Sequence, residues 1–379
     1  MKRGGQALES ILRREERIVF GLRALYSKFG YRPYRMSKFE EYDLYAGNRS
    51  FLPSGGVITF TDTNGRLMAL KPDVTLSIAK NLGGGPDSAA EKLYYDESVY
   101  RAPDSGLGFQ EITQAGLEYL GPVDGYVMGE VAMLAARSLG EISPDWVLDL
   151  SHMGYLCALV DELGLRGPER AELLRAVGSR SAQAMRAVCT AAGAPEEPAD
   201  RLIRLVELYG PATELLPELR ALAATEAELA AADELEDTVR VLASFGCVGG
   251  VNIDLSITCD TEYYNGLVFK GYVPGAPSAV LSGGRYDSLM RKLGKDEQAI
   301  GFAVYLNLLE RLGGAEPEYD ADVLLIPDGE TPEELAGVVR ELTDSGRSVR
   351  VQRGATPSLR CRTVMKMMDG RPVELEGDD

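Results

Sequence analysis

Polar and small residues alternate along residues 110–120, a segment whose apolar and β-branched neighbours predict a strand. Because successive side chains of a strand point to opposite faces, Gln114, Gly116 and Glu118 share one face. Glycine within a strand often marks close approach of a ligand or another backbone, so we expect open space between the amide and the carboxylate. This pair could hold a polar cation such as an amino group or an imidazolium. The alternative is a solvated sheet face, and periodicity does not choose between them.

Two adjacent tyrosines, in the Tyr263-Tyr264-Asn265-Gly266 segment, could line a small-molecule pocket. Tyrosine combines an apolar ring with a polar tip, which suits such a wall. On pattern alone, the favoured interpretation is two strand tyrosines, one buried and one exposed. Asp73 precedes a predicted helix, and its position by itself predicts an N-cap.

Arginine and histidine offer further candidates. Arg101 ends a predicted strand and could bind a carboxylate through two hydrogen bonds, or form an ordinary surface ion pair. The GGRYD segment, residues 283–287, is predicted to be a glycine turn, with only weak support for a phosphate-binding role. His152 is the single histidine. No cysteine or serine dyad is suggested around it, so we expect a structural role.

Helices and antiparallel strands must position these residues. Residues 6–28 carry apolar side chains near helical spacing and predict an amphipathic helix. Asn64-Gly65 lies between two apolar runs and predicts a hairpin. Strands over 92–101 and 109–120 follow, joined by a loop rich in glycine and proline. A helix followed by two hairpins favours an antiparallel sheet over a doubly wound parallel one.

The amino-acid composition changes in the middle of the chain. From about residue 168 to 245, Ala, Leu, Glu and Arg dominate and β-branched residues become rare, which predicts an all-helical insertion. Strand-like sequence is expected again at 251–255 and continues through residues 263–273, which include the paired tyrosines. A helix is expected from about Ser288, and the segment 299–312 predicts a strand followed by a helix.

The C-terminal segment is a separate unit. A buried-strand run begins at Asp322, the Thr331-Pro-Glu-Glu sequence is typical of a capping box, and a second strand follows Gly346. The remainder, residues 354–379, is weakly patterned. We therefore expect an α+β fold with a core over 1–317, a helical insertion at about 160–246, and a truncated α/β region over 318–379.

Composition limits the class of partner and compartment. Asp and Glu number 58 against 40 Lys and Arg, a formal net charge of -18 that repels a polyanion and disfavours nucleic acid. The five cysteines are dispersed, without a CxxC pair or a histidine cluster, which predicts free thiols in the cytoplasm. Neither a signal peptide nor an apolar membrane span is visible. We expect no metal and no cofactor.

Several segments, in the same order, resemble the class II aminoacyl-tRNA synthetase core, specifically its histidyl branch, over about residues 6–312. LKPDVT is similar to LRPEGT, VYR…QAGLEYLG to motif 2, EYYNGLVF to DYYTGTVFE, and SGGRYDSLM…AIGFAVYLNLL to GGRYD followed by motif 3. The predicted helical insertion lies where histidyl enzymes carry theirs. The resemblance implies an antiparallel sheet flanked by helices, and a histidine-binding pocket. The matching pocket residues are Asp73, Thr75, Arg101, Gln114, Glu118, Tyr263, Tyr264 and Tyr286.

The residues that handle ATP in that family are mostly replaced here. Cys259 stands where the family has an arginine at the reacting carboxylate, and Leu308 where motif 3 ends in arginine. Asp104 lies in a motif 2 loop that should be basic. Losing one cation that meets developing phosphoryl charge costs about two to three orders of magnitude in rate, so we expect no adenylation and no catalytic residue. Ser37 replaces the motif 1 proline, which alters the dimer contact rather than dimerisation itself.

This combination, with a shortened anticodon-binding region, resembles the ATP phosphoribosyltransferase regulatory subunit family. The resemblance implies a non-catalytic subunit that dimerises, activates a short-form catalytic subunit and mediates histidine feedback in histidine biosynthesis, without binding tRNA. Histidine could occupy the inherited pocket or an interface with the partner. The alternatives are a divergent active histidyl-tRNA synthetase, a stand-alone histidine-binding scaffold, and an amino-acid ligase with another acceptor.

Overall fold

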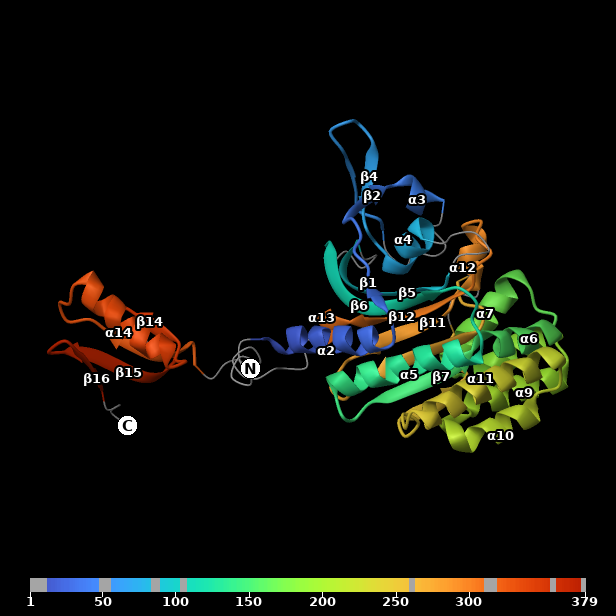
Figure 1. Cartoon of the computed structure of the whole chain (residues 1–379). Coiled ribbons are helices and arrows are strands. Elements are labelled where there is room, and N and C mark those ends of the chain that lie inside the picture. Colours follow the sequence, from blue (N-terminus) through green and yellow to red (C-terminus); the bar gives the residue numbers. More distant parts are fainter. Residues whose placement is uncertain are drawn as a thin grey trace. The chain divides into compact units, whose positions relative to one another are not determined.

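The structure of the chain is a computed structural model. It divides into two compact units, Met1–Leu312 and Gly313–Asp379, both drawn in Figure 1. In the part of the chain that the structure describes, no helix is long and apolar enough to cross a membrane. The described residues are 12–47, 56–82, 89–102, 108–258, 263–309, 319–354 and 359–375.

A nine-stranded sheet forms the centre of the first unit, in the order β1-β5-β6-β12-β11-β10-β7-β9-β8. All neighbouring pairs are antiparallel except β1 with β5 and β7 with β9. The predicted α+β fold with a mainly antiparallel sheet is confirmed. The strands are β1 (Arg32–Pro33), β5 (Glu91–Arg101), β6 (Gln110–Leu120), β7 (Val147–His152), β8 (Tyr209–Pro211), β9 (Val251–Asp254), β10 (Leu267–Tyr272), β11 (Leu281–Arg285) and β12 (Ala299–Tyr305).

Helices cover both faces of this sheet (Figure 1). On β6, Ala115 and Leu117 pack in the large apolar core that includes helices on one face, whereas Leu120 belongs to a second core on the other face. Because side chains two residues apart share a face of a strand, Gln114 and Glu118 lie on the same face as Leu120, the face of the second core. The first face carries α2 (Arg14–Lys28) and α5 (Gly125–Ile142), and the second carries α3 (Asp43–Ala46), α4 (Val74–Asn81) and α12 (Asp287–Lys292).

A small three-stranded sheet, in the order β2-β4-β3, stands beside α4 (Figure 1). It consists of β2 (Phe39–Glu41), β3 (Thr59–Thr61) and β4 (Leu67–Leu70). The hairpin predicted at Asn64-Gly65 is confirmed, since β3 and β4 pair antiparallel around it and Gly65 has φ +79°. Glycine suits this turn because, without a Cβ atom, it adopts positive φ at no steric cost. The predicted first helix is described from Arg14 to Lys28, and residues 6–11 lie outside the described residues.

The predicted glycine turn at residues 283–287 is wrong. Gly283 and Gly284 lie inside β11, a central strand paired on both sides. A Cβ atom on Gly283 would lie 2.3 Å from the Gly301 carbonyl oxygen, and one on Gly284 would lie 2.6 Å from that of Leu267. These glycines therefore allow close approach of neighbouring strands rather than chain reversal. The helix expected near Ser288 is α12.

The helical insertion packs below the sheet in Figure 1. One part of the prediction is wrong: the insertion is not all-helical, because Tyr209–Pro211 forms the short strand β8, which pairs with β9. Gly210 and Pro211 disfavour helix at that point. The helices here are α6 (Met153–Glu162), α7 (Gly167–Gly178), α8 (Ala182–Ala191), α9 (Glu196–Glu207), α10 (Ala212–Leu222) and α11 (Glu226–Ser244).

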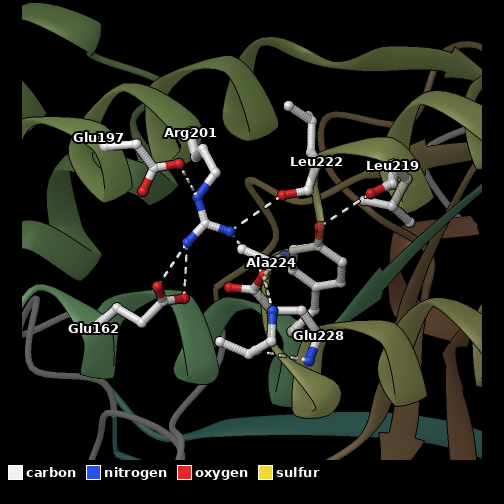
Figure 2. Close-up of polar contacts among 9 residues, drawn as sticks. Glu162, Glu197, Arg201, Leu219, Leu222, Ala224 and Glu228 are labelled. Carbon is white, nitrogen blue, oxygen red and sulfur yellow. Dashed lines mark hydrogen bonds and ion pairs between the residues drawn. The ribbon is translucent and has the colours of Figure 1, made fainter.

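A buried arginine, Arg201 on α9, joins three helices of this layer (Figure 2). Its guanidinium donates to both carboxylate oxygens of Glu162 on α6 at 2.8 Å, and to Glu228 on α11 at 2.8 Å. It also donates to the Leu222 carbonyl at 3.1 Å and lies 2.9 Å from Glu197. Glu228 is itself fully buried, so the helices depend on this charge being compensated.

The C-terminal unit contains a four-stranded sheet, β14-β13-β15-β16, with the helix α14 (Pro332–Asp344). The predicted strand–helix–strand unit is confirmed, and Thr331 with Glu334 forms the predicted capping box. Residues 354–379, which are weakly patterned in sequence, include in their described part a hairpin that was not predicted, and it turns at Asp369-Gly370 with positive φ at both residues. The strands are β13 (Ala321–Ile326), β14 (Val349–Val351), β15 (Cys361–Met368) and β16 (Arg371–Glu374).

Candidate functional site

A buried carboxylate, that of Glu118, lies at the centre of the candidate site. It projects from β6 toward α4 and α12 and is 1% exposed. Its Oε1 atom accepts a hydrogen bond from the Thr75 hydroxyl at 2.6 Å, and its Oε2 atom accepts one from Tyr286 at 2.6 Å. Three segments far apart in the sequence therefore meet at this one side chain.

Two glycines shape the space around Glu118, and one prediction about them is wrong. The space above Gly116 is not open, because a Cβ atom there would lie 2.6 Å from the Tyr95 hydroxyl and 2.2 Å from the Phe302 carbonyl oxygen. Gly301, opposite Glu118 on β12, was not predicted as a site residue. A Cβ atom at Gly301 would lie 1.8 Å from Glu118 Oε2, so the glycine makes room for the carboxylate.

Burial sets the protonation of this carboxylate. Desolvation raises the pKa of Glu118 to about 8, partly opposed by the hydrogen bonds from Thr75 and Tyr286. Burial also raises the pKa of Asp73, with Arg101 as the main opposing influence. An empty site is therefore largely protonated at Glu118 at neutral pH, and a bound cation would favour its ionised form.

The start of α4 places Asp73 and Thr75. Asp73 is the N-cap, as its position predicted: its Oδ1 atom accepts the Leu76 amide at 2.8 Å. Arg101 donates to the Pro72 carbonyl at 3.1 Å, and its guanidinium lies 4.0 Å from the Asp73 carboxylate. Arg101 is thus held beside Asp73 and leaves the cap intact.

Tyrosine rings form one wall. The centroids of Tyr263 and Tyr264 are 4.5 Å apart, and those of Tyr263 and Tyr286 are 5.9 Å apart. Desolvation raises the pKa of Tyr263 and Tyr286 well above the usual tyrosine value, so both hydroxyls stay protonated and can donate. Gln114 is buried on the same face of β6 as Glu118. Asp73 and Tyr286 are the N-caps of α4 and α12, Thr75 lies in α4, Arg101 ends β5, and Gln114 and Glu118 lie in β6. The prediction that Tyr263 and Tyr264 are strand residues is wrong, because β10 begins only at Leu267 and both tyrosines lie in the loop before it.

Sequence reasoning missed a second polar cluster beside α4. Glu40 on β2 accepts hydrogen bonds from Tyr45 and Ser77. Lys71 is fully buried and donates to Glu97 at 2.9 Å. The available signal was Lys71 itself, a cation placed directly between the apolar strand β4 and the Pro-Asp step that starts α4.

The substituted ATP-handling positions are only partly described. Cys259 and Asp104 lie outside the described residues. Leu308 lies in α13 (Leu306–Leu309) and packs partly against the large core. An apolar side chain there offers nothing to a phosphate group. Among residues that the structure describes, no group of three or more His, Cys, Asp or Glu side chains could hold a metal ion, and Cys157, Cys189, Cys247 and Cys361 are free thiols.

The family model for histidyl-tRNA synthetase matches residues 6–309. The ATP phosphoribosyltransferase regulatory subunit of Anaeromyxobacter sp. is 33% identical to this chain over 77% of it and 88% of the relative. The chain belongs to the ATP phosphoribosyltransferase regulatory subunit family. Another member, from Desulforamulus reducens, is 29% identical over 90% of this chain and 88% of its own length.

A solved structure supports this family assignment. The crystal structure titled ATP phosphoribosyltransferase regulatory subunit/histidyl-tRNA synthetase from Bacillus halodurans C has a TM-score of 0.78 and 26% identity, covering 93% of each chain. This likeness therefore extends over most of the sheet unit that carries Glu118. The predicted resemblance, fold class and non-catalytic class of the chain are confirmed by these likenesses.

Proposed function

We propose that this chain regulates ATP phosphoribosyltransferase in the first step of histidine biosynthesis, and that histidine bound around Glu118 is its signal. The regulatory role follows from the family, whose curated members carry the name of regulatory subunit. A regulatory subunit acts on a catalytic partner, here a short-form transferase subunit. The observation that carries the histidine part is the buried Glu118 carboxylate, hydrogen-bonded by Thr75 and Tyr286.

The chemistry of the pocket suits an amino acid with a polar side chain. Histidine offers an ammonium group, an imidazole and a carboxylate. Glu118 and Asp73 can accept from the cationic or N–H groups, and Arg101 beside them can meet the carboxylate. The rings of Tyr263 and Tyr264 provide an apolar wall for the imidazole.

Regulation requires that the assembled enzyme has states that differ in histidine affinity, because a ligand shifts an equilibrium only through differential binding. Hydrogen bonds from Thr75 and Tyr286 to Glu118 already join β6, the start of α4 and the start of α12, so a ligand that contacts Glu118 acts on all three elements. We propose that this joined arrangement is favoured in the inhibited complex. Self-association through the synthetase-like core and the lack of tRNA binding are parts of the same proposal.

Inhibition kinetics of the phosphoribosyltransferase reaction test this function. The catalytic subunit is assayed with and without this chain over a range of histidine concentrations. The proposal expects higher activity with the chain, and histidine inhibition that depends on it. Equal activity and equal inhibition in both samples would contradict the proposal.

Two further measurements separate the alternatives. A divergent synthetase would catalyse ATP–pyrophosphate exchange in the presence of histidine, as would a ligase with another acceptor, and the proposal expects no exchange above background. A stand-alone scaffold would purify without a transferase subunit. The proposal expects stoichiometric co-purification of the two chains from cells that produce both.

A further inference from the structure

Glu234, a carboxylate of the helical insertion, contacts two residues that belong to the sheet unit. From α11, its Oε2 atom lies 2.9 Å from Nε2 of His152, and its Oε1 atom lies 3.6 Å from the guanidinium of Arg285. The hydrogen bond from His152 is the main cause that lowers the pKa of Glu234, so the group is an anion at neutral pH. One carboxylate of the insertion therefore accepts a hydrogen bond from His152 and forms an ion pair with Arg285.

His152 has a fixed role at the start of α6. It is the N-cap of that helix, and its Nδ1 atom accepts the Tyr155 amide at 3.3 Å. A ring nitrogen that accepts carries no proton, so Nε2 carries the hydrogen and donates to Glu234. Directly after it, the Met153 amide donates to the Gly266 carbonyl at 2.9 Å.

Arg285 also contacts the segment that contains Gly266. Its carbonyl accepts the Asn265 amide at 3.2 Å, and its side chain donates to Asp287 at 2.8 Å. Asp287 also accepts from the Asn265 side chain at 3.3 Å. Residues Asn265 and Gly266, which immediately follow Tyr263-Tyr264, are thus held between the two partners of Glu234.

We propose that Glu234 is a positioning residue through which the helical insertion fixes the paired-tyrosine segment, residues 263–266, of the ligand pocket. The inference rests on the proposed function only for the identity of the ligand. A carboxylate is required because one oxygen accepts the His152 hydrogen bond while its negative charge pairs with Arg285 through the other oxygen. Glutamine has the same shape but lacks the charge, so it cannot form the ion pair with Arg285.

The same contacts connect the pocket to the insertion. Tyr286 lies between Arg285 and Asp287 in the chain and donates to Glu118. Arg285, the ion-pair partner of Glu234, is therefore the direct chain neighbour of the tyrosine that binds Glu118.

Hydrogen exchange of the full chain without ligand tests the positioning role. Glu234→Gln is compared with the wild type and with Asp233→Asn, whose carboxylate is the adjacent residue of α11 and pairs with Arg220 inside the insertion. Glu234→Gln should raise exchange at the Asn265 and Met153 amides about fivefold or more, the effect of losing a charge-assisted hydrogen bond. Asp233→Asn should leave both amides unchanged. Wild-type exchange at both amides in Glu234→Gln would overturn the inference.

If Glu234→Gln fails to fold, a second variant still tests the proposal. His152→Asn keeps a favoured N-cap residue on α6 but is too short to reach Glu234, and it should accelerate the Asn265 amide in the same way. Unchanged exchange there would also overturn the inference. Calorimetric titration with histidine then adds a readout of affinity, expected to fall about tenfold in Glu234→Gln and to stay constant in Asp233→Asn. If wild-type protein binds no histidine, the proposed ligand fails, and the exchange result still decides the positioning role.

Discussion

The Tyr286 hydroxyl donates a hydrogen bond to Glu118 across 168 residues of sequence, at 2.6 Å. Tyr286→Phe removes this donor while keeping the ring against Tyr263. A bound cation requires the ionised form of Glu118, and a hydrogen bond to an ionised group contributes about 1.5–3 kcal/mol, so histidine affinity should fall about tenfold or more. The measurement is calorimetric titration of the purified chain. Tyr100→Phe is the matched control, because Tyr100 donates to Glu111 at an exposed position. The histidine affinity of this variant should equal that of the wild type.

The raised pKa of Glu118 predicts a specific dependence of stability on pH. The unfolded carboxyl titrates near 4.5 and the folded one near 8, so between these values only the folded state keeps the proton. Raising the pH through this window therefore destabilises the fold, by up to about 1.4 kcal/mol per pH unit, and the slope ends above pH 8.

Glu118→Gln should abolish this contribution, because glutamine does not titrate. Urea unfolding at pH 5, 6, 7 and 8 gives the free energy of unfolding of both proteins. As the pH rises, the free energy of unfolding of the wild type should fall relative to that of the variant. Parallel curves would show that Glu118 does not titrate in this range.

Gly301→Ala should damage both the fold and the site. The added Cβ atom would meet Glu118 Oε2 at 1.8 Å and the Leu117 carbonyl at 2.4 Å, and the latter is backbone that cannot rotate away. Overpacking of this kind costs about 1–3 kcal/mol. Gly140→Ala on α5 is the control, since its Cβ would meet only Trp146 at 3.7 Å, and it should be neutral or stabilising by up to about 1 kcal/mol. Thermal unfolding of both variants measures the difference.

Arg201→Met should destabilise the helical insertion strongly. Removing the guanidinium leaves the fully buried Glu228 without its cation, which costs about 3–5 kcal/mol. Arg204→Met, three residues along α9, breaks only an exposed pair with Glu218 at 3.8 Å and should cost less than about 1 kcal/mol. Equal effects on the free energy of unfolding would contradict the role of the Arg201 cluster shown in Figure 2.

Local signals in the sequence predicted most of the elements. The Asn64-Gly65 hairpin, the alternation along β6 and the capping box at Thr331 each specify their structure through short-range chemistry. The strand β16 was missed although Asp369-Gly370 is itself a strong hairpin signal. It follows a run of methionines and basic residues with little alternation, which obscured β15.

The site was predictable in part for a similar reason. Gln114 and Glu118 share a face through the period of their own strand, and the family resemblance supplied Thr75 and Tyr286. Gly301 could not be assigned from sequence, because its importance lies in the pairing of β12 with β6. The same holds for Gly283 and Gly284, where the limit on side-chain size comes from neighbouring strands.

The most direct test of the proposed function compares two inhibition curves. The catalytic transferase subunit is assembled with the wild-type chain or with Glu118→Gln, and its activity is measured against histidine concentration. We predict equal activity without histidine, and a half-inhibiting concentration at least about tenfold higher for the variant, because the carboxylate that meets the ligand is gone. Superimposable curves would contradict histidine control through this pocket.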